Sequence, residues 1–460
     1  MIILKKQSAQ SACQAPMNPE FTRQATGGLF ALSGQQGRQL GFVPHPLKLD
    51  HLKGLRTLAG KAPKALPTSY DLRRQGRVSP VKDQGPAGTC WAFASYGSME
   101  SCLLPGESWN FSENNMKNLL SEDCPQGFDR PPDGGGNELM AAAYLARWSG
   151  PVTEAQDPYD PHNGGLCTEL DPQKHLTRVV FVPDRQGSTD NDNLKTAIMN
   201  YGAVFTSLYY DDSAYQETNS AYYYNGRAQA NHAICLVGWN DLYSKSNFKS
   251  RPSGDGAYIA QNSWGTSWGD QGFFYISYYD SVVGTANALF NRSDSPDTFK
   301  VNYQYDPLGW VTSIGYGQSS AWLANRFQAS GDHKVGAVAW YAASPESSYE
   351  LYIYLDPTAS DPRSGQQALA LKGSSGDPAY FTRVLPTAVN LKKGQWFSVA
   401  LKINTPGYNY PVPVQMPISG YSSQAQAGSG KSFISLDGSQ WEDITTVWSN
   451  TSVCIKAIAL

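Results

Sequence analysis

The sequence has few charged residues and lacks long hydrophobic runs. Asp, Glu, Lys and Arg make up 16% of 460 residues, against about 25% in an average globular protein. Asp and Glu (39) outnumber Lys and Arg (36), which argues against a nucleic-acid-binding protein. The sequence contains no stretch of 18 or more apolar residues, so we expect no membrane-spanning helix. It also shows no repeat of fixed period.

Apolar and aromatic residues are abundant by contrast. They make up 40% and 12% of the chain, which excludes a wholly disordered protein because disorder requires low hydrophobicity and high net charge. At about 100–200 residues per domain, the length predicts two to four domains.

Charge is distributed unevenly along the chain. Residues 1–65 carry a net charge of +7, and the remainder carries −10. Such a basic segment is a solvated tail, a nucleic-acid-binding arm or a segment docked on its own chain, and composition leaves these open. The first six residues are followed by Gln, Ser and Ala, without the apolar core of roughly 7–15 residues that a secretory signal needs. Either a signal peptide is missing from this chain or the protein stays inside the cell.

Three regions differ in their local patterns. Residues 1–65 show little periodicity, residues 66–290 mix helix and strand signals, and residues 291–460 contain short apolar runs separated by Gly, Pro, Asp and Ser, as in a β-sandwich. In the middle region we expect helices over 90–104, 137–148 and 194–201, the last capped by Ser188 or Asp190, and strands over 234–239, 257–260 and 272–278. In the third region we expect strands over 300–305, 335–341, 349–355, 395–403, 432–436 and 452–460.

One segment carries the pattern of a nucleophile. Pro80-Val-Lys-Asp-Gln-Gly-Pro-Ala-Gly-Thr-Cys90 is a Gly- and Pro-containing loop that runs into a helix. A cysteine at a helix N-terminus is favoured as thiolate. The leaving group of the reaction must also receive a proton, which a histidine can supply. His232 stands at the start of a segment that we expect to be a buried strand. Asn262 follows 30 residues later and supplies an amide oxygen to orient the imidazole.

With these neighbours, Cys90, His232 and Asn262 resemble the papain/cathepsin family of cysteine peptidases. The resemblance begins at Leu66-Pro-Thr-Ser-Tyr-Asp and extends to about residue 290. It implies a two-lobe catalytic domain, with a helical lobe and a β-barrel-like lobe. Cys90 would be the nucleophile, His232 the general acid and base, Asn262 its orienting partner and Gln84 a donor to the oxyanion. The residues implied for substrate binding are Gly135, Gly136, Ala233 and Trp264.

The cysteines depart from the family pattern in one respect. Ala87 stands where the family has a cysteine, and the partner expected near Asp133 is also missing, so one disulfide is lost as a whole. The resemblance implies that the other disulfide is kept as Cys124–Cys167. A disulfide indicates an oxidising compartment and therefore a secreted protein. The remaining cysteines stay unassigned, and these are Cys13, Cys102, Cys235 and Cys454.

The flanking regions also resemble known segments. Residues 1–65 are similar to the short pro-region of bacterial family members, so we expect residues around 41–52 to lie in the active-site cleft, helped by the opposite charges. Cleavage is expected near 61–66. Residues 291–460 resemble the lectin-like β-sandwich that follows some bacterial papain-like peptidases, carried by the runs 390–399, 430–443 and 454–457. This resemblance describes the fold, and it leaves sugar binding, a packing role and a substrate-positioning role open for the domain.

Together these observations predict an α+β fold: a propeptide (1–65), a papain-like catalytic domain (66–290) and an all-β sandwich (291–460). The predicted function is a secreted cysteine endopeptidase made as a zymogen, without cofactor or metal. Its partners would be a polypeptide substrate and its own propeptide, with a glycan as a further candidate and neither nucleic acid nor a membrane. The alternatives are a carbohydrate-binding or adhesive protein that carries a peptidase domain, and an acyl-transferring transpeptidase.

Overall fold

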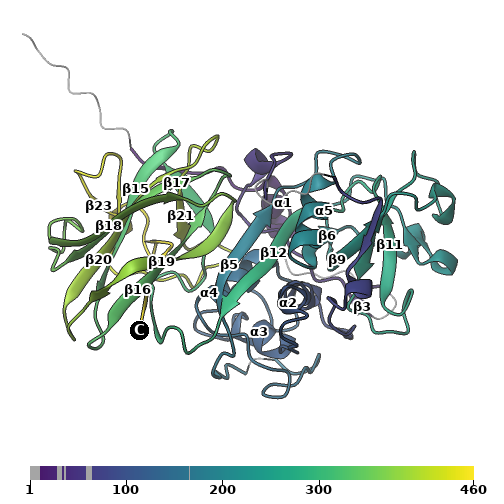
Figure 1. Ribbon diagram of the computed structural model, residues 1–460, viewed down its shortest axis with the longest axis horizontal. Coiled ribbons are helices and arrows are strands. Elements are labelled where there is room, and N and C mark those ends of the chain that lie inside the picture. Colours follow the sequence, from purple (N-terminus) through teal and green to yellow (C-terminus); the bar gives the residue numbers. More distant parts are fainter. Residues whose placement is uncertain (1–10, 28–33, 36–37, 59–64, 165) are drawn as a thin grey trace, which may run out of the picture.

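The computed structural model describes residues 11–27, 34–35, 38–58, 65–164 and 166–460 (Figure 1). In Figure 1 the green-to-yellow C-terminal sandwich lies at the left, and the blue-to-teal part with the helices lies at the centre and right. The purple N-terminal residues lie between the two, along the top of the view. No helix in the described ranges is long and apolar enough to cross a bilayer.

In Figure 1 the helices over 90–103, 113–119 and 138–146 lie together at the bottom centre, and those over 19–27 and 192–200 lie higher in the view. The predicted helices over 90–104 and 137–148 are present within two residues of the expected bounds. The third was expected to begin at a Ser188 or Asp190 cap, which is wrong, because the Asp190 carboxylate instead accepts the Gln186 N–H and Asn191 precedes the helix. The helices are α1 (Pro19–Gly27), α2 (Cys90–Leu103), α3 (Glu113–Leu119), α4 (Glu138–Ala146) and α5 (Asp192–Asn200).

The largest sheet runs through both halves of the molecule. Its continuity depends on β19 pairing antiparallel with β5, with Ala379 opposite Val180 and Phe381 opposite Arg178. In order its strands are β13 (Val301–Tyr303), β25 (Ile455–Ala459), β16 (Lys334–Ala342), β19 (Ala379–Asn390), β5 (His175–Val182), β12 (Thr285–Asp294), β6 (Val204–Leu208), β9 (His232–Asn240), β10 (Ala257–Gln261), β11 (Phe273–Ser277), β8 (Ala221–Tyr222) and β7 (Tyr215–Gln216), and β4 (Ser69–Asp71) pairs with β9.

Three smaller sheets complete the fold, and one of them forms the second layer of the sandwich. That layer consists of β18 (Gln366–Ser374), β17 (Ser348–Leu355), β20 (Trp396–Asn404), β15 (Ser320–Gln328), β22 (Ser432–Ser435) and β23 (Glu442–Asp443). The other two are β1 (Cys13–Gln14), β14 (Thr312–Gly315), β21 (Val412–Gln415) and β24 (Ser452–Val453), and the pair β2 (Gly34–Gln35) and β3 (Arg38–Gln39).

The structure has two large apolar cores: one lies between the layers of the sandwich, and the other fills the helical half and extends to sandwich residues such as Tyr341 and Tyr380. In the sandwich, Val338 of β16 and Ile455 of β25 share one buried cluster with Leu351 of β17 and Val399 of β20, so the two layers pack face to face. In the other half, α2 is buried on almost every side and packs against β6, β9 and β12. The predicted α+β class with a C-terminal all-β sandwich is confirmed.

The cysteines of the described residues include one disulfide. Cys124 and Cys167 form a disulfide with a Cα–Cα distance of 5.5 Å, which confirms the implied pairing. Cys13 is exposed, whereas Cys235 and Cys454 are buried as thiols and fill core positions as small apolar groups.

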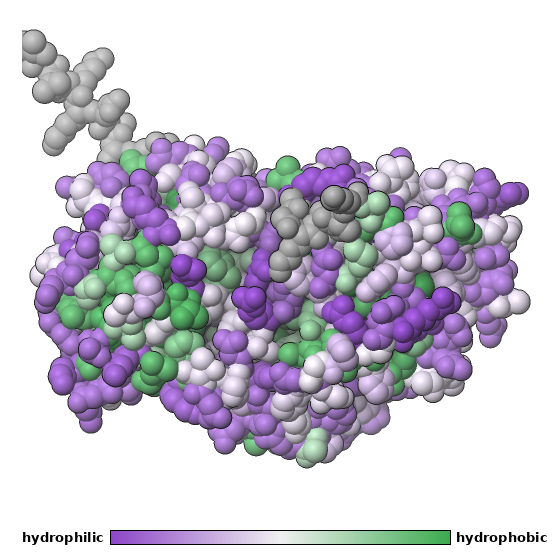
Figure 2. Space-filling view, in the orientation of Figure 1, coloured by the Kyte–Doolittle hydropathy of each residue, from purple (hydrophilic) through white to green (hydrophobic). Residues whose placement is uncertain are grey.

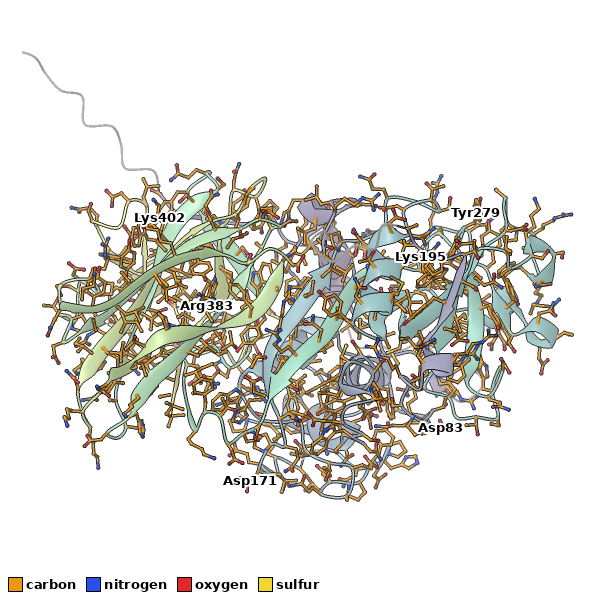
Figure 3. All side chains as sticks on the ribbon, viewed as in Figure 1. Asp83, Asp171, Lys195, Tyr279, Arg383 and Lys402 are labelled. Atoms are coloured by element: carbon orange, nitrogen blue, oxygen red, sulfur yellow. A yellow bond between two sulfur atoms is a disulfide. The ribbon has the colours of Figure 1, made fainter. Side chains whose placement is uncertain are left out.

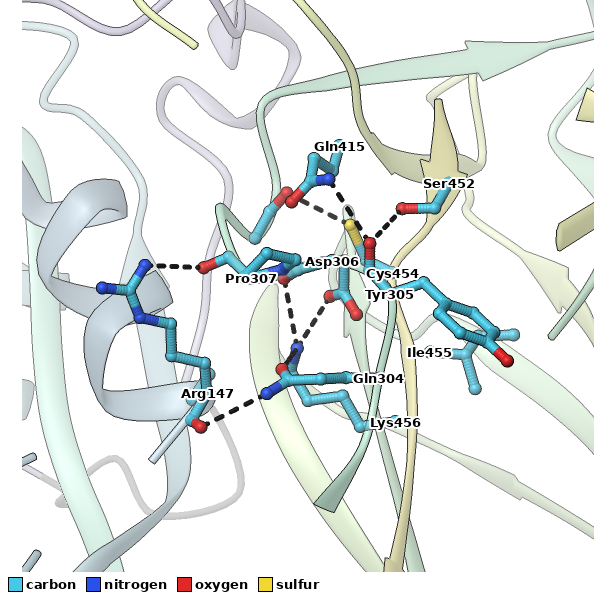
Figure 4. Close-up of polar contacts among 12 residues, drawn as sticks. Arg147, Gln304, Tyr305, Asp306, Pro307, Gln415, Ser452, Cys454, Ile455 and Lys456 are labelled. Atoms are coloured by element: carbon cyan, nitrogen blue, oxygen red, sulfur yellow. Dashed lines mark hydrogen bonds and ion pairs between the residues drawn. The ribbon is translucent and has the colours of Figure 1, made fainter. Parts of the chain in front are cut away.

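The two halves also meet through a buried polar cluster (Figure 4). Lys456 of β25 forms an ion pair with Asp306 at 2.9 Å, and both side chains are almost completely buried. The Lys456 ammonium also donates to Gln304 Oε1 at 2.7 Å, and Gln304 Nε2 donates to the carbonyl of Arg147 at the end of α4. The sandwich therefore contacts the helical lobe through hydrogen-bonded polar groups.

The surface differs between the two halves. On the face shown in Figure 2, apolar residues gather over the sandwich at the left, and polar residues cover most of the remainder. Val384 of β19 is the most exposed large apolar residue among the described strands, at 58%. Figure 3 places the neighbouring Arg383 on the sandwich and Lys195 on α5, where Lys195 pairs with Asp241.

We predict that Lys456→Met lowers the free energy of unfolding by about 3–5 kcal/mol, because it leaves the Asp306 carboxylate buried without its cation. Urea unfolding followed by tryptophan fluorescence measures the effect. Lys300→Met is the matched control, since its partner Asp297 is exposed, and it should change stability little. Equal stability of the Lys456→Met variant and the parent chain would contradict the prediction.

Candidate active site

Cys90 is the first residue of α2 and is completely buried. Its Sγ accepts the backbone N–H of Ala233 at 3.4 Å. Burial raises the pKa of the Cys90 thiol to about 11, and the backbone N–H groups of Ala233, Gly41 and Trp91 offset this only in part. The thiolate expected from the helix N-terminus is therefore not the favoured form while the residue is covered.

His232 is the first residue of β9, and the N–H of the next residue, Ala233, is the group that contacts Cys90 Sγ. His232 Nε2 donates to Asn262 Oδ1 at 2.8 Å. His232 Nδ1 is buried and has no hydrogen-bond partner among the described residues. Burial lowers the pKa of His232 to about 4, although the Asn262 bond raises it. The imidazole is thus neutral and has one nitrogen free to accept a proton.

Asn262 and Trp264 follow β10 and surround the imidazole. The Asn262 Oδ1 also accepts the Ser263 N–H at 2.9 Å, which fixes the orientation of the amide. The Trp264 ring stacks on the His232 ring with centroids 4.8 Å apart, and the edge of Tyr210 packs against Trp264 at 4.7 Å. Because Trp264 is only 3% exposed, these rings shield the His232–Asn262 bond from water.

Gln84 lies in the loop before α2, next to Asp83, which is labelled in Figure 3. Its Oε1 accepts the Ser263 hydroxyl at 2.7 Å, which directs the Nε2 group toward α2. That Nε2 donates to the carbonyls of Ala87 at 2.8 Å and Gln39 at 3.0 Å. The amide is therefore preoriented and already has a carbonyl oxygen from the N-terminal residues as its acceptor.

Gly136 pairs its backbone with the extended N-terminal residues, whereas the Gly135 carbonyl accepts Arg130 Nε. The Gly136 N–H donates to the Gly41 carbonyl at 2.9 Å, and the Val43 N–H donates to the Gly136 carbonyl at 3.1 Å. A Cβ on Gly136 would lie 2.5 Å from the Trp91 ring, and one on Gly135 would lie 2.6 Å from Val43. Both positions therefore require glycine for this close approach.

The residues 38–47, here called the cleft segment, cover this site. Phe42 is buried, its N–H donates to the Asn231 carbonyl at 3.0 Å, and its ring packs against Phe205. The Arg38 guanidinium lies 5.7 Å from the centre of the Trp264 ring. Farther along, His45 Nε2 pairs with Glu138 Oε1 at 3.1 Å. These contacts combine backbone pairing, apolar burial and charge.

The sequence reasoning missed Arg130, which holds the glycine loop. Its buried guanidinium donates to the carbonyls of Gly134 and Gly135, both at 2.7 Å, and to that of Lys117. It also lies 5.0 Å from the centre of the Trp91 ring. Burial lowers the pKa of Arg130 to about 9. Nothing in the local sequence distinguishes this arginine from an exposed one.

A second missed residue is Tyr159, whose hydroxyl lies 2.7 Å from the Thr89 hydroxyl and donates to the Gln84 carbonyl at 2.8 Å. It thus links the residue before Cys90 to the residue expected to bind the oxyanion. Tyr159 lies within the part of the chain covered by the family resemblance, and that was the available signal.

Comparisons with known proteins place both halves of the chain. Residues 66–291 match the family model described as papain family cysteine protease, and residues 302–459 match the one described as lectin like domain. Among curated relatives, a probable cysteine protease RD19B of Arabidopsis thaliana is 30% identical over 48% of this chain and 60% of its own length. A cathepsin L-like peptidase of Aedes aegypti is 29% identical over 48% of this chain and 63% of its own length. The chain therefore spans about three fifths of these relatives.

Among solved structures, one covers nearly the whole chain. It contains the cysteine protease and lectin-like domains of Cwp84, a surface layer associated protein of Clostridium difficile, with 25% identity, a TM-score of 0.82, and coverage of 98% of this chain and 99% of that one. A second structure, a variant of the same protein after propeptide cleavage, has 26% identity, a TM-score of 0.74, and coverage of 85% and 98%.

We predict that iodoacetamide alkylates Cys90 of the full chain slowly at pH 7, because a thiol pKa of about 11 leaves little thiolate. The rate should rise by about tenfold per pH unit between pH 8 and pH 10. Peptide mapping by mass spectrometry measures the rate, and exposed Cys13 serves as the internal reference. Alkylation of Cys90 as fast as that of Cys13 at pH 7 would show that the site is open.

Proposed function

Residues 66–291 belong to the papain family of cysteine proteases and residues 302–459 form a lectin-like domain, and from this premise we propose that the chain is the zymogen of a secreted cysteine endopeptidase. The family resemblance drawn from the motifs is thereby confirmed, as is a cysteine protease domain. The observation that carries the proposal is the contact chain from Cys90 Sγ through the Ala233 N–H to His232 and Asn262.

The proposed reaction uses each of these groups once. Cys90 Sγ loses its proton to His232 Nδ1, since Nε2 is held by Asn262, and attacks a peptide carbonyl carbon. Gln84 Nε2 donates to the oxyanion that forms, in place of its present bond to the Gln39 carbonyl. His232 then protonates the leaving amine, which leaves a thioester that water hydrolyses. Gly136 pairs with the backbone of the substrate.

The zymogen part of the proposal rests on the cleft segment. Its residues take the backbone partners that a substrate would need, and they bury both Cys90 and His232. When the segment leaves, water and substrate can reach the site, so the thiol pKa falls and the imidazole pKa rises toward an ion pair. The coverage of this chain by the Cwp84 structures supports the same division, since it falls from 98% to 85% once the propeptide is cleaved.

The C-terminal sandwich holds the N-terminal segment on both sides of the cleft. β1 pairs with β14, with Cys13 opposite Gly315. Beyond the cleft, His51 Nε2 lies 2.8 Å from the Ala343 carbonyl and its ring stacks on Tyr408. The Leu58 N–H donates to Asp377 Oδ1 at 2.8 Å. We therefore assign the sandwich a packing role toward this segment.

Charge contributes to this binding at a few positions. Arg56 pairs with Asp192 at 2.8 Å on the surface, in addition to the buried His45–Glu138 pair. Most other contacts between the described N-terminal residues and the rest of the chain are backbone hydrogen bonds or apolar packing. The net charges of +7 on residues 1–65 and −10 on the remainder are therefore a secondary factor in this binding. The predicted cleavage region, 61–66, lies mostly outside the described residues.

Sugar binding by the sandwich stays a prediction. Several of its aromatic rings already pack against a cation, because the Arg363 guanidinium lies 4.4 Å from the centre of the Trp322 ring and 5.2 Å from that of Tyr352. The Arg363 guanidinium thus covers part of the ring surface on which a sugar would stack.

We expect the wild-type chain to lose its N-terminal segment up to the region 61–66 on incubation at mildly acidic pH, and then to bind one epoxysuccinyl thiol probe on Cys90. Intact mass measures both events. Cys90→Ala is the matched control and should show neither. If the wild type stays whole and unlabelled even after an added protease trims the segment, the proposed triad is inactive.

Gly41→Ala should give an unprocessed chain that hydrolyses peptides at least tenfold faster than the unprocessed parent. A Cβ at residue 41 would lie 1.8 Å from the Gly88 carbonyl oxygen. This clash prevents the cleft segment from binding in its present position over the site. Gly187→Ala is the control, because no atom lies within 4 Å of its added Cβ. A fluorogenic peptide assay on freshly purified full-length chain measures the rates. Equal rates for Gly41→Ala and the parent would argue against occlusion by this segment.

A further inference from the structure

A cavity of about 470 Å³ lies beyond the cleft segment, between the N-terminal residues and the peptidase domain. Phe42, which pairs with Gly136, lines its near side, so a residue that pairs with Gly136 directs its side chain into this cavity. On the peptidase side the lining includes Phe181, Ser207 and two carboxylates, Glu138 and Asp184.

Glu138 is the first residue of α4, two residues after Gly136, and is 2% exposed. Its Oε1 pairs with His45, and its Oε2 is buried without a hydrogen-bond partner among the described residues. Burial raises the pKa of nearby Asp184 to about 7, and the Glu138 charge adds to this effect. The Ala286 N–H donates to Asp184 Oδ1 at 2.9 Å. The cavity thus holds a buried carboxylate oxygen with spare acceptor capacity.

The cations that offset these carboxylates belong to the removable segment. His45 and Lys53 are the positive groups that act on Asp184, and His45 binds Glu138 directly. Burial disfavours charge on His45, but Glu138 and Asp184 outweigh this and raise its pKa above the usual value. On the peptidase side, exposed Arg227 at the rim is the cation that lines the cavity. Removal of residues 1–65 therefore leaves the carboxylates without His45 and Lys53.

We propose that this cavity is a specificity subsite that selects a lysine or arginine side chain of the substrate, with Glu138 as its principal partner and Asp184 as a second. This inference rests on the proposed peptidase function. The apolar stem of the basic side chain lies against Phe205 and Phe181, and its charged end reaches Glu138, as long basic side chains commonly do. A neutral aromatic residue fills the same walls but leaves a buried carboxylate unpaired, which is costly.

The test uses the full chain after self-processing and a peptide series in which each of three residues on the acyl side of the scissile bond is in turn arginine, lysine, norleucine or phenylalanine. At one of these positions we expect arginine or lysine to exceed norleucine at least tenfold in kcat/KM. In Glu138→Gln this ratio should fall to about threefold or less, and in Asp184→Asn it should fall by a smaller factor.

Glu107→Gln is the matched control for loss of a carboxylate, because Glu107 pairs with Lys174 beyond the far end of α2, and it should keep the wild-type ratio. The inference is overturned if norleucine or phenylalanine equals the basic residues at all three positions. It is also overturned if Glu138→Gln keeps the wild-type ratio.

A binding measurement separates this inference from the proposed hydrolysis. Cys90→Ala is trimmed in trans by the wild type or by an added protease, and fluorescence anisotropy gives the Kd of the arginine and norleucine peptides. If the arginine peptide binds more tightly than the norleucine peptide and the wild type hydrolyses neither, the proposed peptidase function is wrong and the proposed subsite is supported. Equal Kd values, or binding of neither peptide, would overturn the subsite.

Discussion

The contact between the N-terminus of α2 and strand β9 is the interaction on which the candidate site depends. The Ala233 N–H reaches Cys90 Sγ, and one turn further along α2 the Cys235 thiol donates to the Ala94 carbonyl at 3.0 Å. Gly97 permits this approach, because a Cβ there would lie 2.9 Å from the Cys235 sulfur. Since β9 also carries His232, the packing of helix on strand sets the position of thiol and imidazole without an intervening loop. Neighbouring β4, β6 and β10 hold β9 in place.

Local signals were sufficient for the elements that carry the site and insufficient for the sheet that joins the two halves. The loop before Cys90 and the apolar run after His232 specify a helix start and a buried strand, and both are present. The pairing of β19 with β5 joins residues about 200 positions apart, and β19 alternates irregularly between buried and exposed residues. Such a pairing has no local sequence signature, because it forms only where each of the two strands has an unpaired edge in the folded molecule.

The region around Gly135 illustrates a further limit of sequence reasoning. The absence of cysteines at Ala87 and near Asp133 indicated that a covalent link had been lost, but the residues that hold this loop could not be identified. In the structure the Gly88 N–H donates to the Asp133 carbonyl at 2.8 Å, and Arg130 binds the carbonyls that follow. An arginine is seldom fully buried, so the residue type and the sequence neighbours of Arg130 predict a position on the surface. Only the closed ring of carbonyl acceptors explains its burial.

The protonation of Cys90 follows from two opposing effects of different size. A helix N-terminus stabilises a thiolate by about 0.3–1 kcal/mol in exposed sites and up to about 2 kcal/mol in partly buried ones. Removing a charged group from water costs several kcal/mol unless partners replace the lost hydration. Backbone N–H groups replace part of it at Cys90, and burial still dominates. Under the proposed zymogen function, the cleft segment therefore blocks the substrate path and also keeps the nucleophile protonated. Both effects depend on Gly41, because only a residue without a Cβ can lie against the Gly88 carbonyl.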